Sequence, residues 1–216
     1  GTGGVAVIAG KYWQAKAAAK AVVVQWDHGP AATLNSAGIT RQLTERLAAD
    51  DGFGYFSQGD PAAALQQAAK TLKAEYSAPL LAHATLEPQN CTVHYTPDAK
   101  DGPRATVWAP TQVPGLGRWA AAKALGLDSE QVAMNVTLLG GGFGRRLEVD
   151  FIAQAAHVAK ALPGVPVQTF WSREQDSTHD FYRPPCVARY QAGFDSQGRL
   201  TAWVAASAGQ IGRAHV

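Results

Sequence analysis

The sequence predicts an α+β fold, in which helices and strands are interspersed along 216 residues. Two observations lead to this prediction. Apolar residues recur at helical spacing between residues 149 and 162, and two pairs of strand-like runs, at 90–109 and 187–206, are each joined by a polar turn. A hydrophobic content of 46% with 17% charged residues is typical of a folded protein with a sizeable core. The formal net charge of +2 does not indicate a nucleic acid or an acidic membrane surface as partner.

Residues 1–30 predict a strand, a helix and a second strand. The expected elements are strands at 5–9 and 22–26 and a helix at 12–21. Many Ala and Lys residues favour the helix, and Asp27-His28-Gly29-Pro30 is a strong turn signal. This unit is too small to be stable alone, so we interpret it as the end of a domain that begins upstream. Residues 31–70 are interpreted as a linker with a local helix at 39–49.

Residues 71–209 are richer in strand patterns. The expected strands are 72–76, 90–95, 105–109, 131–139, 165–171, 187–194 and 200–206, and the expected helices are 117–125 and 149–162. Gly126 is predicted to end the first helix, because a glycine readily adopts the left-handed backbone conformation there. Asp128 is predicted to cap the turn that follows. Cys91 and Cys186 are isolated and are expected to be free, packed thiols.

The most informative segment is the run Leu-Gly-Gly-Gly-Phe-Gly-Arg-Arg-Leu-Glu at residues 139–148. Glycines between a strand and a helix allow bare backbone to approach a ligand closely, and backbone N–H groups there can bind an anion. Arg145 and Arg146 could add charge-assisted donors. The run is neither a dinucleotide fingerprint nor a P-loop, since Arg145 replaces the last glycine and no Gly-Lys-Ser/Thr follows. From spacing alone, a ligand-binding loop and a purely structural turn both remain open.

Several segments together resemble the molybdopterin-binding large subunit of the xanthine dehydrogenase and aldehyde oxidase family, in the family's order. The matching segments are His83 to Pro88 (HATLEP), Asn90-Cys91-Thr92, Thr111-Gln112, Gly140 to Gly144 (GGGFG), Trp171 to Glu174 (WSRE) and Asp180 to Pro184 (DFYRP). Arg145-Arg146 in place of Gly-Lys resembles the branch of isoquinoline 1-oxidoreductase beta subunits and related membrane-associated aldehyde dehydrogenases.

The resemblance implies the domain organisation. Residues 1–30 would be the C-terminal part of an a/b hammerhead domain, and residues 71–209 the N-terminal part of a molybdopterin-binding domain. It also implies a molybdenum ion on molybdopterin cytosine dinucleotide, held through the pterin dithiolene and not by protein side chains. The expected reaction is oxidation of an N-heteroaromatic or aldehyde C–H with water-derived oxygen. The electrons would pass to [2Fe–2S] clusters on a small partner subunit, with a cytochrome c as a further candidate partner.

The resemblance also assigns residues. Gln112, Gly141, Gly142, Phe143, Gly144, Arg145 and Arg146 are expected to bind the cofactor. Gln112 would hydrogen-bond at the molybdenum oxo or pterin end, and Phe143 would also wall the substrate pocket. Leu147 stands where purine-oxidising relatives have a glutamate, which favours a more apolar heteroaromatic or an aldehyde. The family's general-base glutamate lies near the C-terminus of the full subunit, beyond this chain, so we expect the chain alone to be an inactive fragment.

Other readings stay open at this point. The main alternative is a non-catalytic anion- or nucleotide-binding module that uses the Gly140–Arg146 loop, and a third is a piece that docks a redox partner. His83 and Glu87 lie four residues apart, as in some zinc sites, although Pro88 argues against that interpretation. Residues 210–216 are interpreted as sequencing-adapter read-through. No stretch is long enough to be a predicted membrane span; localisation stays open, with a periplasmic or membrane-associated place favoured by the resemblance.

Overall fold

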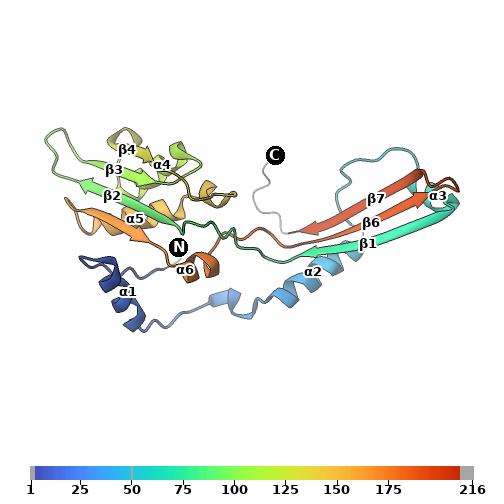
Figure 1. Cartoon of the computed structure of the whole chain (residues 1–216), viewed down its shortest axis with the longest axis horizontal. Helices are drawn as coiled ribbons and strands as arrows, with labels where there is room; N and C mark the ends of the chain where they lie inside the picture. The colour runs from blue at the N-terminus through green and yellow to red at the C-terminus, as the bar shows by residue number, and fades with distance from the viewer. Residues whose placement is uncertain (1–2, 50, 210–216) are drawn as a thin grey trace. The chain divides into compact units, whose positions relative to one another are not determined.

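A computed structural model describes residues 3–49 and 51–209. These residues form two compact units (Figure 1). The first contains residues 3–29 and 83–181, and the second contains residues 30–82 and 182–209. The range 71–209, which the sequence indicates as part of one domain, therefore contributes to both units. The predicted domain boundaries stay a prediction, and the interpretation of residues 210–216 lies outside the described part of the chain.

The first unit is built on a four-stranded sheet in the order β4-β3-β2-β5. Its strands are β2 (Asn90–Thr96), β3 (Arg104–Ala109), β4 (Val132–Val136) and β5 (Pro166–Phe170). β2 is antiparallel to both β3 and β5, which confirms the predicted pairing of the first two strands. β3 and β4 are parallel. A parallel pair requires a crossover connection, and helix α4 (Pro114–Leu125) supplies it.

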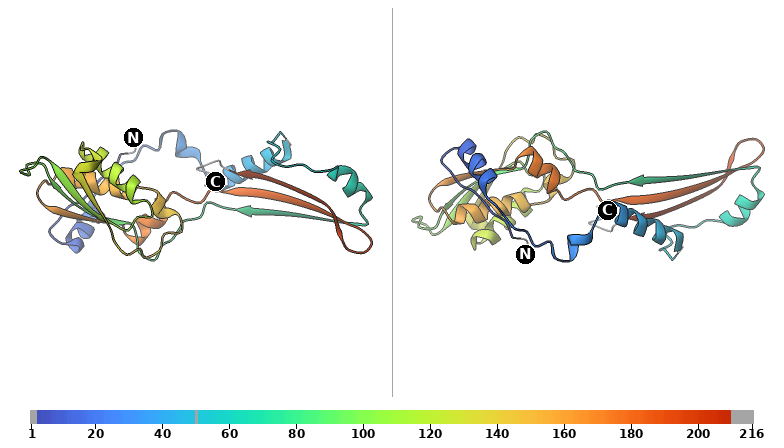
Figure 2. Two further views of the ribbon diagram at one scale, coloured as in Figure 1. Left: turned by 90° about the horizontal axis from the view of Figure 1, so that it is seen from above. Right: turned by 90° about the horizontal axis from the view of Figure 1, so that it is seen from below.

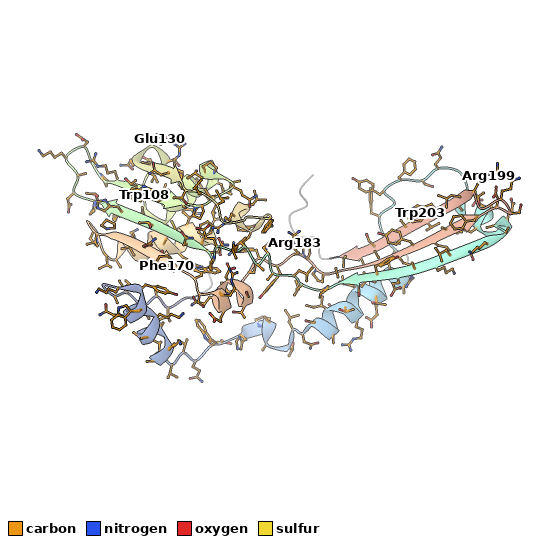
Figure 3. All side chains as sticks on the ribbon, in the orientation of Figure 1. Trp108, Glu130, Phe170, Arg183, Arg199 and Trp203 are labelled. Carbon is orange, nitrogen blue, oxygen red and sulfur yellow. The ribbon has the colours of Figure 1, made fainter. Side chains whose placement is uncertain are left out.

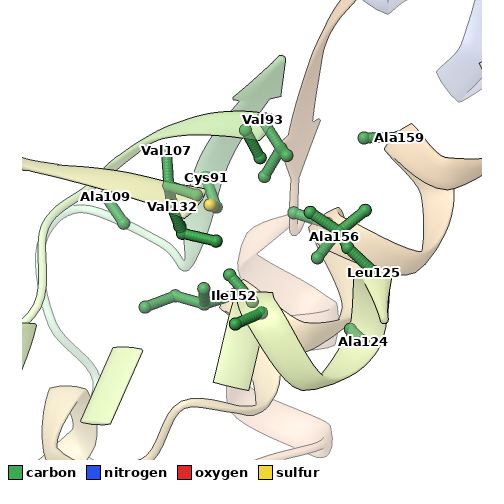
Figure 4. Close-up of a cluster of buried hydrophobic side chains, with 14 of the residues drawn as sticks. Cys91, Val93, Val107, Ala109, Ala124, Leu125, Val132, Ile152, Ala156 and Ala159 are labelled. Atoms are coloured by element: carbon green, nitrogen blue, oxygen red, sulfur yellow. The ribbon is translucent and has the colours of Figure 1, made fainter. Parts of the chain in front are cut away.

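Two helices cover one face of this sheet and form the core shown in Figure 4. α5 (Asp150–Lys160) directs its buried side chains toward α4 and the sheet, as the predicted apolar spacing requires. Alanines dominate the contact between the helices, and their small side chains allow the two helix backbones to approach closely. The buried members of the core on these helices are Ala121, Ala122, Ala124, Leu125, Phe151, Ile152, Ala155, Ala156 and Ala159.

The predicted strands at 5–9 and 22–26 are absent from the structure, whereas the predicted helix between them is present as α1 (Tyr12–Ala21). Both runs are largely exposed, and Val23 is 96% exposed. A strand needs a neighbouring strand for its backbone hydrogen bonds, and neither run has one among the described residues. The ring of Tyr12 packs edge-on against Phe170 of β5, with centroids 5.2 Å apart.

The second unit contains a three-stranded antiparallel sheet in the order β1-β6-β7. Its strands are β1 (Lys70–Ala78), β6 (Cys186–Phe194) and β7 (Leu200–Gly209), and the last two form the predicted hairpin. Both views of Figure 2 show the three strands running alongside one another. Two helices precede them, α2 (Ser36–Ala49) and α3 (Pro61–Gln67), with a short 3-10 turn at Gly29–Thr33. Leu65 and Ala68, at the end of α3, pack beside Gly193 of β6.

Two short elements were not predicted. α3 begins at Pro61, directly after its N-cap Asp60. α6 (Arg173–Thr178) begins with a capping box formed by Ser172 and Gln175. The strand predicted over 131–139 ends at Val136, because the next residues leave the sheet to form the glycine-rich loop. Two predictions are confirmed: Gly126 ends α4 at a φ of 79°, and Asp128 caps the 3-10 turn Ser129–Gln131. Within the described residues, no helix has the length and apolar character that crossing a bilayer demands.

Candidate functional site

The glycine-rich loop lies between β4 and α5 and ends in a 3-10 turn at Arg145–Leu147. Its backbone is unusual: φ is 100° at Gly141, 53° at Phe143 and 102° at Gly144. Glycine adopts such left-handed conformations without strain, whereas a bulky residue such as Phe143 does so rarely. Positive φ in a non-glycine residue is a feature that often marks a ligand-binding position.

Two of the glycines are required by contacts within the protein. A Cβ at Gly140 would collide with the Cβ of Glu87, and one at Gly142 would lie 2.6 Å from Oε1 of Gln112. The sequence predicted that these glycines serve the close approach of a ligand. The structure adds a second reason, because the loop passes so close to Glu87 that a side chain at position 140 does not fit, and a side chain at position 142 would displace the amide of Gln112.

Glu87 joins the loop to the preceding HATLEP segment. Its Oε2 accepts hydrogen bonds from Gly140 N at 2.9 Å and from Arg146 Nη2 at 2.9 Å. Its own backbone N–H donates to Gly140 O at 3.0 Å. One carboxylate therefore holds both the start and the end of the loop.

Arg146 is fully buried, with 0% of its side chain exposed, and all its contacts are with protein groups. Its Nε donates to Gly141 O at 2.7 Å, and Nη2 donates to Glu87 O at 2.7 Å. Nη1 donates to Pro110 O at 3.2 Å and, more weakly, to Gln89 Oε1 at 3.4 Å. Burial lowers the pKa of Arg146, and the charge of Glu87 offsets this only in part.

Arg145 is also buried, but among carboxylates. It donates to both oxygens of Asp150 at 2.8 and 2.9 Å, and its Nε lies 2.7 Å from Asp180 Oδ1. The guanidinium carbon also lies over the rings of Trp171 and Phe181, at 5.3 and 5.4 Å from their centroids. Burial alone would lower the pKa of Arg145, but the hydrogen bond and charge of Asp150, with the charges of Asp180 and Asp176, raise it overall.

Gln112 fits against the loop through its amide oxygen. Oε1 accepts from Gly144 N and from Arg146 N, each at 3.3 Å, and the backbone N–H of Gln112 donates to Arg146 O at 3.1 Å. Two N–H donors facing one amide atom identify that atom as the oxygen. The Nε2 group is thereby directed away from these donors, and it has no hydrogen-bond partner among the described residues.

Three donors on or against the loop are therefore unpaired within the described residues. The backbone N–H groups of Gly141 and Gly142, like Nε2 of Gln112, donate to no other group in the described part of the chain. Phe143 beside them is 64% exposed. Such an array of unsatisfied donors next to left-handed glycines can bind an oxygen-rich anion.

The site includes residues that the sequence did not single out as functional. His83 and Asp180 form a pair at the edge of the loop, with His83 Nδ1 3.1 Å from Asp180 Oδ2. Gln89 is fully buried beside Arg146. The spacing of His83 and Glu87 in the sequence resembles that of some zinc sites. In the structure the two side chains have different partners, since Glu87 contacts Arg146 and His83 contacts Asp180. Within the described residues no group of three or more His, Cys, Asp or Glu side chains could hold a metal ion.

Within the first unit, residues from several of the segments that carried the sequence resemblance lie at this site. Arg173 Nη2 donates to the carbonyl oxygens of Thr85 and Leu86 at 2.6 and 2.8 Å, which joins the WSRE segment to HATLEP. The seven residues predicted to bind a cofactor lie together on or against the loop, although Arg145 and Arg146 are directed inward. Their contact with a cofactor stays a prediction. Figure 3 locates Arg183, which lies in the second unit, where its backbone pairs with that of Leu81.

A glycine loop held by buried ion pairs, with unpaired backbone and amide donors, is the arrangement expected of a loop that binds an anionic group. The family model described as molybdopterin cofactor-binding domain matches residues 42–214. The chain belongs to this family.

Individual relatives agree with the family. The chain is 31% identical over 201 residues to the membrane-bound aldehyde dehydrogenase [pyrroloquinoline-quinone] of Gluconacetobacter polyoxogenes, covering 93% of this chain and 25% of that protein. It is 35% identical over 118 residues to isoquinoline 1-oxidoreductase subunit beta of Brevundimonas diminuta, covering 55% of this chain and 14% of that protein. The chain thus spans a quarter or less of the length of these relatives.

The fold is that of solved molybdenum hydroxylase structures. Quinoline 2-oxidoreductase from Pseudomonas putida 86 superposes with a TM-score of 0.69 at 18% identity, over 92% of this chain and 25% of that one. This likeness confirms the mixed helix-and-sheet fold. These relatives are oxidoreductases, which leaves the alternative of a non-catalytic anion-binding module without support.

Proposed function

We propose that this chain is part of the large subunit of a molybdenum hydroxylase, which oxidises an N-heteroaromatic or aldehyde C–H with water-derived oxygen. One observation supports this proposal above the others. In a chain of the molybdopterin-binding family, the glycine-rich loop keeps the N–H groups of Gly141 and Gly142 and the amide of Gln112 free of partners within the described residues.

These donors fit the group that the family binds. A molybdopterin is rich in oxygen, sulfur and phosphate acceptors, and the loop and Gln112 offer three donors that are unpaired within the described residues. We assign cofactor binding to Gln112, Gly141, Gly142, Phe143 and Gly144, and we propose the cytosine dinucleotide form. When bound, the cofactor supplies a centre that takes two electrons from the substrate. The protein binds and orients it, and no side chain of this chain is proposed to ligate the metal.

Arg145 and Arg146 belong to the same site in an indirect role. Their donors are directed at Asp150, Glu87 and backbone carbonyls, so we propose that they support the cofactor through the conformation of the loop. Arg146 holds the Gly141 carbonyl at 2.7 Å. Because the Gly141 carbonyl and the Gly142 N–H belong to one trans peptide group, this contact directs the Gly142 N–H to the opposite side.

Phe143 is proposed to wall the substrate pocket. It projects from the loop with 64% of its surface exposed, held in place by a left-handed backbone. An aromatic wall suits a planar heteroaromatic ring or an apolar aldehyde. Leu147, where purine-oxidising relatives have a glutamate, agrees with this substrate class.

Further partners follow from the same proposal. We propose a small [2Fe–2S] subunit as the electron acceptor, with a cytochrome c as a later one, and residues 1–30 as the end of a hammerhead domain. The general-base glutamate would come from another part of the subunit, as the resemblance to the family implies.

The deciding experiment is the metal and cofactor content of the full-length protein that carries this chain, produced in a host that makes the cofactor. We expect near-stoichiometric molybdenum and pterin, lost in Gly142→Val, because any Cβ at 142 collides with Gln112. Gly115→Ala on α4, where a Cβ meets nothing within 4 Å, is the matched control and should keep both.

The same measurement distinguishes the molybdenum cofactor from pyrroloquinoline quinone, which the name of the Gluconacetobacter relative mentions. Folded wild-type protein that contains pyrroloquinoline quinone and no molybdenum would contradict the proposal. Equal molybdenum in wild type and Gly142→Val would instead contradict the role of the loop.

A further inference from the structure

His83 is a nearly buried histidine that is held rigidly from one side. Its side chain is 11% exposed, and Nδ1 lies 3.1 and 3.3 Å from the two oxygens of Asp180. The backbone N–H of His83 donates to the same carboxylate at 2.6 Å. A carboxylate can only accept hydrogen bonds, so Nδ1 carries a proton. The position of the ring is therefore fixed through this nitrogen.

Asp180 is itself fixed, by Arg145. Its Oδ1 lies 2.7 Å from Arg145 Nε, and the Asp180 side chain is 2% exposed. Arg145 is anchored in turn on Asp150. This chain of contacts leads from α5 to the imidazole without a flexible link, and a side chain held in this way can present its remaining polar atom in a defined direction.

The remaining polar atom of His83 faces the glycine-rich loop. Nε2 is 3.5 Å from the position that a Cβ would occupy at Gly144, and it has no hydrogen-bond partner among the described residues. Gly144 N is also the donor to Gln112 Oε1. His83 and Gln112 therefore both contact Gly144, and each has an unused nitrogen.

We infer that His83 is a further ligand-contacting residue, whose Nε2 forms a hydrogen bond with the cofactor bound on the loop; this inference rests on the function proposed above. The absence of a side chain at Gly144 leaves the space next to Nε2 open. Asp180 acts as a positioning residue, because it touches the ligand only through His83.

The alternative role of His83 is purely structural: its Nδ1 joins the HATLEP segment to Asp180. Two substitutions separate the roles. In His83→Asn the amide nitrogen replaces Nδ1 and keeps the bond to Asp180, but the distal nitrogen is lost. In His83→Gln the amide lies near the position of Nε2 and can donate or accept, but the bond to Asp180 is weakened.

The test compares molybdenum and pterin retained after prolonged dialysis of the full-length protein, together with its thermal unfolding midpoint. For His83→Asn we expect an unchanged midpoint and about tenfold weaker retention, which corresponds to about 1.4 kcal/mol, as for one lost hydrogen bond. His83→Gln should retain most of the cofactor. His157→Asn, on the exposed face of α5, is the control and should behave as wild type.

Wild-type retention by His83→Asn would overturn the inference while leaving the proposed function intact. Loss from His83→Gln as large as that from His83→Asn would also overturn it, because a distal polar group would then not matter. Absence of cofactor from the wild-type protein is a different result, and it would refute the proposed function itself.

Discussion

Arg145 and Arg146 are adjacent in the chain and both buried, yet their surroundings are different. Arg145 is paired with two carboxylates and lies over two aromatic rings, whereas Arg146 has one carboxylate and several backbone carbonyls. The pKa of Arg145 is accordingly raised and that of Arg146 lowered. Arg146 is thus the more sensitive of the two to the loss of its single counter-charge.

This difference leads to a prediction for Glu87→Ala. Removing one member of a buried ion pair leaves the other charge uncompensated. Because the Glu87 side chain is 32% exposed and Arg146 keeps its carbonyl partners, we expect a loss of about 2 to 3 kcal/mol, near the low end for such pairs. Urea unfolding followed by circular dichroism measures it.

Asp101→Ala is the control for that experiment. Asp101 and Arg104 form an exposed pair at 3.7 Å in the same unit, with side chains 86% and 58% exposed. We expect its removal to change the free energy of unfolding by less than about 0.5 kcal/mol. Equal effects of the two substitutions would show that the Glu87–Arg146 pair does not stabilise the loop.

At the scale of elements, α4 shows how local sequence and packing agree. Pro114 opens the helix, where its missing N–H needs no partner, and Gly126 closes it in the left-handed conformation. Between them, Gly117 packs against Ile152 of α5 so closely that a Cβ there would lie 2.9 Å from the Ile152 Cδ1. The ends of the helix follow from its own sequence, whereas Gly117 is explained only by its neighbour.

Two glycine-to-alanine changes on this helix should have opposite effects. Gly126→Ala places a side chain at a φ of 79°, and we expect it to lower the free energy of unfolding by about 1 to 2 kcal/mol. The added Cβ would meet only Lys160 Nζ at 3.7 Å, so strain is the sole cause. Gly115→Ala lies in the helix with open space around it and should raise the free energy by up to about 1 kcal/mol.

Urea unfolding midpoints, compared at constant m-value, give the change in the free energy of unfolding for both variants. Destabilisation by Gly115→Ala of the same size as that by Gly126→Ala would contradict this account of the helix ends.

At the scale of the whole molecule, the two units each contain one cysteine. Cys91 lies on β2 in the core of the first unit, 1% exposed, whereas Cys186 begins β6 in the second unit and is half-buried. Both thiols are free, as predicted. Each cysteine therefore reports on the opening of its own unit.

Burial raises the pKa of the Cys91 thiol from 9.0 to about 12. The unfolded chain loses this proton near pH 9, while the folded chain retains it. The contribution of the buried thiol to stability is therefore complete below about pH 9 and is lost as pH rises toward 12.

Alkylation with iodoacetamide at pH 8, followed by mass spectrometry, should modify Cys186 well before Cys91, because the thiolate is the reactive form and Cys91 is both buried and protonated. In urea the two rates should converge. Equal rates in the native protein would show that the first unit opens readily under native conditions.

The sequence by itself determined the local elements and the family. Apolar periodicity predicted the helix at 149–162, the Gly126 stop signal marked the end of the helix at 117–125, and polar turns predicted both hairpins. The order of short motifs indicated a molybdopterin-binding protein. These features depend on residues close together in the chain, so they can be read from it directly. The strands predicted at 5–9 and 22–26 were wrong, because a local apolar pattern does not show whether a partner strand is available.

Only the tertiary structure decided what the site residues contact. Arg146 meets Glu87 across 59 positions, and His83 meets Asp180 across 97. No spacing rule specifies such pairs, since they depend on how separate segments pack. The two arginines, which the sequence predicts as cofactor-binding residues, lie buried among carboxylates and backbone carbonyls, since a buried guanidinium is stable only where such groups surround it. Their part in cofactor binding stays a prediction.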